Sequence, residues 1–292
     1  MTSHGVRPSG ESPLESEWCS IGVPRVRQLL RRRPLQARLG AGRGPETVPR
    51  GVAAAVSVIV PTLNEAGRLA HLLEALRMQT LPPQEVIVAD AGSSDGTAEL
   101  AHRAGCRVVE GGRPAVGRNY GAAAATCDVL LFLDADVVPS ADFIERALDE
   151  FGATGASAAT AAFEPLEAGR LNSFIAMGVN QFLRVTQSFS PHAPGFCILA
   201  RRDSHESVGG FDETLALAED HDYVRRLARH GKFRVLTSVS IAVSMRRIEE
   251  EGVVPLGLKY TWCEACVLAG VPIRSVPFRY RFGVHAPPAQ KR

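Results

Sequence analysis

The stretch that most constrains this chain is Leu130–Val137, LLFLDADV, in which an apolar run ends in two aspartates. The run Leu130–Leu133 predicts a buried strand, most easily at the centre of a parallel sheet. Asp134 and Asp136 then lie at its carboxyl end, where open α/β sheets bind ligands. Alternate residues of an extended segment point the same way, and adjacent carboxylates repel each other unless a proton or a cation intervenes. The pattern therefore indicates a site for Mg²⁺ or Mn²⁺, against the alternative of a strand end with two solvated acids.

Strand-like and helix-like segments alternate around this stretch. The spacing of Leu69, Leu72 and Leu76, for example, is that of one face of an amphipathic helix. The predicted strands cover residues 56–60, 85–90, 106–109, 128–133, 155–163, 196–200 and 238–243. This alternation is typical of βαβ units and predicts an α/β fold with a mostly parallel sheet flanked by helices.

Charge and composition divide the chain into three parts. Residues 1–50 hold nine Arg and four Glu among many Gly, Pro and Ser, which predicts a disordered basic extension. Residues 51–245 carry the α/β pattern as a single domain, and residues 246–292 hold an amphipathic helix and a tail. The net charge is +2 for the whole chain, so the part outside the extension is close to neutral, which argues against a nucleic-acid partner.

The cysteines and the apolar runs indicate the cellular compartment of the chain. The six cysteines are scattered, and several lie in strand-like sequence, which favours reduced thiols in a cytoplasmic protein. No run approaches the ~18 apolar residues of a membrane span, and none resembles a secretory signal. Residues 246–269 join Arg246 and Arg247 to an apolar helix. This helix either packs on the domain's own core or lies on the inner face of the cell membrane.

Five motifs in order along residues 55–245 carry a family resemblance. They are VSVIVPTLNE (Val56–Glu65), VADAGSSDGT (Val88–Thr97), GRNYG (Gly117–Gly121), DAD (Asp134–Asp136), and GFDE from Gly210 with the later acidic pair Glu219-Asp220. No single motif is specific, but together they resemble the family-2 glycosyltransferases of GT-A fold. The resemblance implies one α/β domain that moves a sugar from a nucleoside-diphosphate donor, with inversion of configuration.

The resemblance also implies where the donor nucleotide lies. Pro61, Thr62 and Glu65 would line its pocket after the first strand. Asp90 would hydrogen-bond the base, and Asp95 would lie near the ribose or order the Gly-rich turn. The acceptor would be a saccharide or a lipid-linked molecule that presents a hydroxyl or a phosphate.

The remaining implied roles concern the sugar and the diphosphate. Arg118 would approach the base or the phosphates, and Asp134 would meet the ribose or the sugar. Asp136 would bind the Mg²⁺ or Mn²⁺ ion that bridges the diphosphate, and Asp220 would be the general base. The chemistry agrees with these residue types, because the leaving phosphate needs its charge neutralised and the acceptor needs a proton acceptor.

Asp220 also has an explanation without catalysis. It lies at the start of a predicted helix, where a carboxylate is favoured by the helix dipole and can act as a cap. In that case Asp222 or Glu219 would be the base.

Two other functions are open for the whole chain: a sugar nucleotidyltransferase and a catalytically silent nucleotide-sugar-binding module. The first would need a Gly-rich loop with a basic residue after the first strand, which Pro61–Glu65 does not provide. The second would be favoured if the DAD motif or the late acidic pair were missing, and both are present.

Four histidines fall in predicted loops or turns, where an isolated histidine is expected at the surface: His192, His205, His221 and His285. His192 precedes the predicted strand at 196–200, where the resemblance implies acceptor-site residues.

Overall fold

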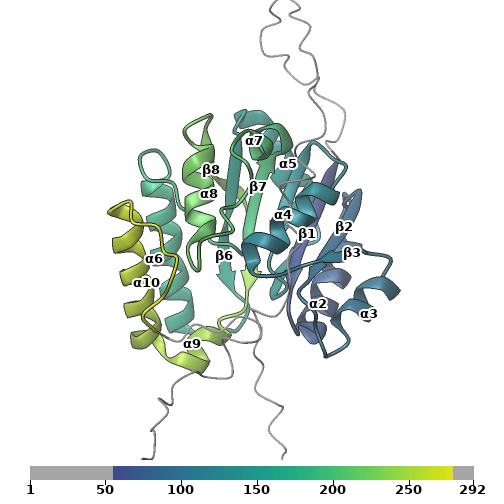
Figure 1. Cartoon of the computed structure of the whole chain (residues 1–292), viewed down its shortest axis with the longest axis horizontal. Coiled ribbons are helices and arrows are strands. Elements are labelled where there is room, and N and C mark those ends of the chain that lie inside the picture. Colours follow the sequence, from purple (N-terminus) through teal and green to yellow (C-terminus); the bar gives the residue numbers. More distant parts are fainter. Residues whose placement is uncertain (1–54, 279–292) are drawn as a thin grey trace, which may run out of the picture. The chain divides into compact units, whose positions relative to one another are not determined.

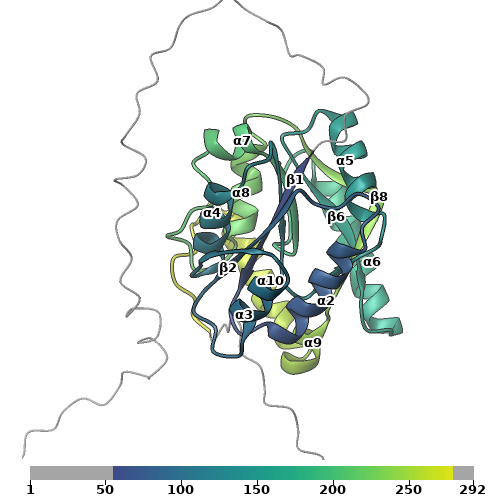
Figure 2. The ribbon, with the colours of Figure 1, turned by 90° about the vertical axis from the view of Figure 1, so that its right-hand side faces the viewer.

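The computed structural model describes residues 55–278. The predicted extension, residues 1–50, and residues 279–292 of the predicted tail lie outside them. The strands are β1 (Val56–Thr62), β2 (Glu85–Asp90), β3 (Arg107–Glu110), β4 (Val129–Leu133), β5 (Val137–Pro139), β6 (Ala158–Pro165), β7 (Cys197–Arg201) and β8 (Phe233–Val243). They form one sheet in the order β3-β2-β1-β4-β7-β6-β8-β5, with helices on its faces (Figures 1 and 2).

The helices of the described residues alternate with these strands along the chain. They are α2 (Ala66–Arg77), α3 (Thr97–Arg103), α4 (Pro114–Ala124), α5 (Phe143–Thr154), α6 (Arg170–Thr186), α7 (Arg202–Ser207), α8 (Glu219–Leu227), α9 (Arg246–Glu251) and α10 (Val253–Leu268). Within residues 55–278, no helix combines the length and the apolar character needed to cross a bilayer.

The predicted buried strand is β4, and it lies between two cores. Leu131 and Leu133 belong to the core on the side of α2 and α5, whereas Leu130 and Phe132 belong to the core on the side of α4 and α8. Alternate side chains of a strand point to opposite faces, so a continuous apolar run is what a strand covered on both faces requires.

The pairing around β4 is mixed. β4 runs parallel to β1 but antiparallel to β7, so the predicted parallel environment is right on one side only. Four strand pairings of the sheet are parallel and three are antiparallel. The direction of a neighbour cannot be predicted from an apolar run, because both directions bury the same side chains.

Glycines of the GRNYG motif allow α4 to lie close to the sheet. A Cβ atom at Gly121 would stand 2.3 Å from Ile59 Cγ2, and one at Gly117 would stand 3.2 Å from Pro61 Cβ. Any larger residue at Gly121 would therefore push α4 away from β1. This packing carries the neighbouring Arg118 into the interior, where its side chain is buried.

Candidate active site

Asp90 ends β2, and its carboxylate is bound by its own turn. Oδ1 accepts hydrogen bonds from Thr62 Oγ1 at 3.1 Å and from Ser93 Oγ at 2.6 Å. Oδ2 accepts from the backbone N–H groups of Gly92 and Ser93 at 3.1 and 2.9 Å. Four donors use the acceptor capacity of a carboxylate. A contact between Asp90 and a nucleobase stays a prediction, and it would require one of these bonds to be exchanged.

Asp95 orders the Gly-rich turn. Its carboxylate accepts hydrogen bonds from the backbone N–H groups of Ala66 and Thr97 at 2.9 and 3.1 Å, and from the Thr97 hydroxyl. One side chain thereby joins the first turns of α2 and α3. Burial raises the pKa of Asp95, but these hydrogen bonds outweigh burial and leave the pKa lowered.

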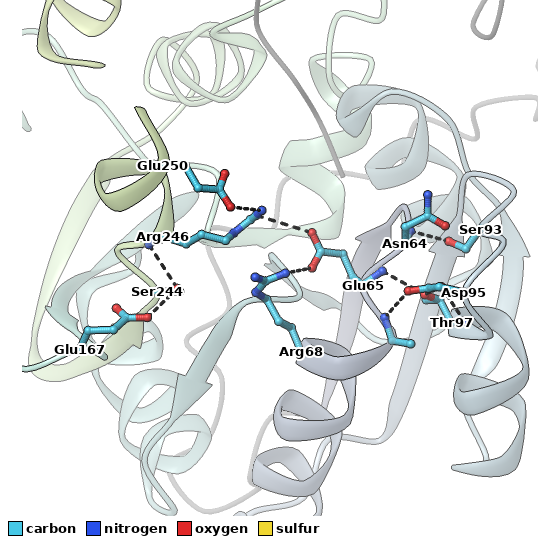
Figure 3. A network of polar contacts seen from close by, with 11 residues as sticks. Asn64, Glu65, Arg68, Ser93, Asp95, Thr97, Glu167, Ser244, Arg246 and Glu250 are labelled. Carbon is cyan, nitrogen blue, oxygen red and sulfur yellow. Dashed lines mark hydrogen bonds and ion pairs between the residues drawn. The ribbon is translucent and has the colours of Figure 1, made fainter. Parts of the chain in front are cut away.

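Glu65 lies between this turn and the C-terminal part of the described chain (Figure 3). Its carboxylate forms ion pairs with Arg68 at 3.0 Å and with Arg246 at 3.9 Å. Arg246 begins α9 and also pairs with Glu250 at 3.4 Å. Helix α9 therefore contacts Glu65, a residue predicted to line the donor pocket, and the role of residue 245 as a domain boundary stays a prediction.

Asp134 and Asp136 lie in a turn. β4 ends at Leu133 and β5 begins at Val137, so the prediction that the two aspartates share an extended segment is wrong. The reason is β5, which pairs with the distant β8 and turns the chain immediately after β4.

The Asp136 carboxylate lies close to two other acids, Asp134 and Glu65. Burial, then the charges of Asp134 and Glu65, raise the pKa of Asp136 to about 6, although Arg246 and Arg247 act in the opposite direction. Within residues 55–278, no three His, Cys, Asp or Glu side chains converge closely enough to hold a metal ion by themselves. The oxygen ligands present fit a hard divalent cation that takes its other ligands from a bound diphosphate and water.

Arg118 is a buried cation that joins two acidic motifs. Its Nη2 pairs with Asp134 Oδ1 at 3.0 Å and donates to the Gly195 carbonyl at 3.2 Å, and its Nη1 pairs with Glu219 Oε1 at 2.7 Å. Burial by itself lowers the pKa of Arg118, but the charges of Asp134, Glu219 and Asp220 outweigh it and raise the pKa. Both Nη groups are bound by the protein, and a contact between Arg118 and the donor stays a prediction.

Asp220 is the second residue of α8 and does not cap the helix. The N-cap residue is Ala218, which has a left-handed backbone with φ of 61°. The explanation of Asp220 as a cap is therefore wrong. Asp220 Oδ1 accepts a hydrogen bond from the backbone N–H of His221 at 2.8 Å. Asp220 Oδ2 lies beside Gly195, where an added Cβ atom would stand 3.2 Å from it.

The three acids at the start of α8 differ in their partners. Glu219 pairs with Arg118, and Asp222 pairs with Arg226 at 2.6 Å. In the part of the chain that the structure describes, Asp220 forms no ion pair. The structure thus separates one unpaired carboxylate from two that are held by arginines.

The GRNYG motif and the GFDE motif bind each other. Asn119 Nδ2 donates to the Phe211 carbonyl and to Glu213 Oε1, both at 2.9 Å, and Asn119 Oδ1 accepts from the Phe211 backbone N–H at 2.8 Å. Gly210 has φ of +74°, and a Cβ atom there would lie 2.5 Å from Asn119 Oδ1. These motif residues are scaffold that fixes α4 against the segment before α8.

His192 links the loop before β7 to α10. It is 1% exposed, its Nδ1 lies 2.6 Å from the Ser190 carbonyl, and its Nε2 lies 2.9 Å from the Glu264 carboxylate of α10. The expectation of a surface His192 is therefore wrong. Burial and Asp220 raise the pKa of Glu264, but the bond from His192 and the charges of His192 and His221 outweigh them and lower it. Glu264 was not singled out from the sequence, because nothing in its local spacing indicates a partner so far away.

His205 is also buried, against the same expectation. Its Nδ1 lies 2.8 Å from the Tyr223 hydroxyl. Burial, then the charges of Arg202 and Arg226, lower the pKa of His205 to about 4. His221 is half-buried, and His285 lies outside the described residues.

Comparison with known proteins identifies the family. Residues 57–209, more than half of the chain, match the family described as glycosyl transferase family 2. The succinoglycan biosynthesis protein ExoA of Rhizobium meliloti is 30% identical over 193 residues, which cover 60% of this chain and 58% of the relative. The pre-mycofactocin glycosyltransferase of Mycobacterium tuberculosis is 30% identical over 195 residues, covering 60% and 39%. The chain thus spans less than two thirds of these relatives.

Solved structures agree on the fold. The mannosyltransferase PcManGT from Pyrobaculum calidifontis superimposes with a TM-score of 0.54 at 22% identity, over 79% of this chain and 64% of that one. TarS of S. aureus, residues 1–349 with UDP, gives a TM-score of 0.55 at 20% identity, over 65% and 60%. The predicted α/β GT-A fold and the predicted family are confirmed. The chain belongs to glycosyl transferase family 2.

Proposed function

We propose that this chain transfers a sugar, with inversion, from a nucleoside-diphosphate donor to a hydroxyl or phosphate of a saccharide or lipid-linked acceptor. The observation that carries the proposal is the Arg118 bridge. It ties the strand-end Asp134 at 3.0 Å to Glu219 at 2.7 Å, and Glu219 directly precedes Asp220. One buried cation thereby joins the acids proposed to bind the donor to the helix that bears the proposed base.

A divalent cation, Mg²⁺ or Mn²⁺, would be held by Asp136, with Asp134 and Glu65 close by. When bound, the ion would neutralise charge on the leaving diphosphate. Two observations support this assignment. Asp136 lies beside two further acids, Asp134 and Glu65, and burial together with their charges raises its pKa to about 6. PcManGT was solved with GDP-Man and Mn²⁺, and glucosyl-3-phosphoglycerate synthase of Mycobacterium tuberculosis was solved with Mn²⁺ and UDP.

Asp220 would accept the proton of the acceptor. It lies in the first turn of α8, where the helix dipole favours the ionised carboxylate that a base must be. Its neighbours Glu219 and Asp222 are paired with arginines, so Asp220 is the acid of this turn that no ion pair among the described residues holds in place. A single base opposite the leaving diphosphate gives one in-line displacement, and hence inversion.

The function is tested by donor binding and turnover with and without metal. UDP-, GDP- and dTDP-sugars are screened by thermal shift, because a ligand that binds only the native state raises Tm. We expect one nucleotide class to raise Tm when Mn²⁺ or Mg²⁺ is present. EDTA should abolish transfer, and Asp136→Ala should lose both donor affinity and rate. The control is Asp149→Ala, an exposed aspartate of α5. Full activity in EDTA contradicts the metal assignment, and donor binding without any turnover favours a silent module.

A further inference from the structure

The exposed apolar side chains of this protein are concentrated in two segments. Among residues 55–278, all large apolar side chains that are exposed, except Met78, lie within 166–189 or 253–271. They are Leu166, Leu171, Phe174, Met177, Phe182, Val185, Phe189, Val253, Val254, Leu258, Tyr260, Leu268 and Val271. We call this set the α6–α10 surface, after the helices that carry most of it. Single exposed apolar residues are ordinary, but such concentration marks an interaction site.

Helix α6 has two apolar faces, and the fold covers only one. Its buried residues are Ala176, Leu183 and Thr186, which face β6 and the cores. The exposed side chains of Phe174 and Val185 belong to a second stripe, with exposed fractions of 67% and 58%. A helix that only had to pack on the sheet would carry polar residues on that second face.

Helix α10 has the same property. It buries Leu256, Cys263 and Val267, whereas Leu258 and Leu268 are 68% and 65% exposed. α6 and α10 lie at the same edge of the structure, at the left in Figure 1. They are linked through His192, which contacts the Phe182 ring of α6 at 5.1 Å between centroids and the Glu264 carboxylate of α10. The surface therefore includes the helix whose Glu264 lies 3.7 Å from His221, the residue that follows Asp220.

The two helices of this surface carry three basic residues, Arg170, Arg184 and Lys259, and one acid. Helix α6 contains Arg170 and Arg184, both exposed, and no Asp or Glu, whereas Glu164 and Glu167 lie just before it. On α10 the acid is Glu264, which turns toward His192. Apolar helix faces with basic and few acidic neighbours are typical of helices that lie in the headgroup region of anionic bilayers.

We propose that the α6–α10 surface docks on an anionic lipid bilayer. The further step, that docking brings the site to an acceptor held in that bilayer, rests on the proposed function. A second copy of the chain fits the surface less well. A two-fold contact would bring the same patch against itself, and α6 offers two arginines but no acid to pair with them across such a contact.

The test is co-sedimentation of the full-length protein with vesicles, at low salt. One set is phosphatidylcholine, and the other contains phosphatidylglycerol as well. We expect binding to the anionic vesicles, weakened by added salt. The triple variant Phe174→Ser, Phe189→Ser and Leu258→Ser should lose at least about tenfold in partitioning, since burial of even one such side chain is worth that much. Its matched control is Met78→Ser, the exposed apolar residue outside the surface.

A second pair of variants tests the charge. Arg170→Glu should weaken binding to the anionic vesicles by about fivefold or more. The control is Arg103→Glu, which makes the same change in net charge at an exposed position of α3 and should bind like the wild type.

The proposal is overturned if the wild type ignores anionic vesicles, if the triple variant binds like the wild type, or if Met78→Ser is equally impaired. It is also overturned if the wild type is a dimer that the triple variant dissociates. Donor-induced Tm shifts without lipid should be the same in the triple variant and the wild type, which verifies its folding. Vesicle binding without any donor binding would refute the proposed function and leave the docking intact.

Discussion

The acids of the early turns and the acids of the DAD motif and α8 are held in different ways. Asp90 and Asp95 are bound by donors of their own turn and of the adjoining first strand and helix. Asp134 and Glu219 are held by Arg118, which is 101 residues from Glu219 in the chain. These local hydrogen bonds order the two turns, and the predicted contacts of Asp90 and Asp95 with a donor nucleotide stay predictions. Arg118 thereby positions the segments that also carry Asp136 and Asp220, and neither of these two acids forms an ion pair among the described residues.

Removal of Arg118 should be the most damaging change to the remotely assembled site. Arg118→Met leaves Glu219 buried beside Asp220 without its cation. Breaking a buried ion pair from one side costs about 3–5 kcal/mol in the free energy of unfolding. Urea denaturation measures this loss. The double variant Arg118→Met/Glu219→Gln should recover part of it, because the unpaired charge is gone. Stability unchanged in Arg118→Met would mean that the bridge does not hold the two motifs together.

Lowering the pH should destabilise the region around α8 before the early turns. The group responsible is His205 of α7, which contacts Tyr223 of α8. His205 has its folded-state pKa lowered from 6.5 to about 4, so the unfolded chain takes up a proton first as the pH falls. Its contribution is complete above pH 6.5 and is lost between pH 6.5 and 4. The loss amounts to about 3 kcal/mol. His205→Gln should flatten this part of the stability profile, measured by urea denaturation at several pH values. An unchanged slope would contradict the buried neutral imidazole.

The smallest effect is expected in the early turn. Asp95→Ala removes the acceptor for the Ala66 and Thr97 N–H groups and should cost about 0.5–2 kcal/mol, as the loss of a helix cap does. Because the pKa of Asp95 is lowered, its contribution to the free energy of unfolding is lost only as the pH falls below the ordinary value of 3.8. The variant should therefore keep the wild-type slope of stability against pH between 6.5 and 4. Thermal unfolding at neutral pH measures the cost. A collapse of the fold would show that the turn is more than a local scaffold.

The same difference explains what the sequence could predict. β2 was predicted with its observed bounds, Glu85–Asp90, because its strand and turn signals are local. β5 is not predicted, because a three-residue strand is ordered by its pairing with β8 rather than by its own pattern. α9 is not predicted either, since its six residues include no buried residue and therefore give no periodic apolar pattern. The candidate acids can be found from local motifs, but the Arg118 bridge and the His192–Glu264 contact join segments far apart in the chain. Such pairings leave no periodic signal.

The most direct test of the catalytic assignment is Asp220→Asn. Asp220 is neither a cap nor part of an ion pair among the described residues, so the variant should fold normally and bind the metal and donor like the wild type. Its kcat should fall at least about a hundredfold, as expected for loss of a general base. Asp222→Asn is the matched control, because Asp222 is held by Arg226 and should leave kcat within a few fold of wild type. If Asp220→Asn turns over as fast as Asp222→Asn, Asp220 is not the base.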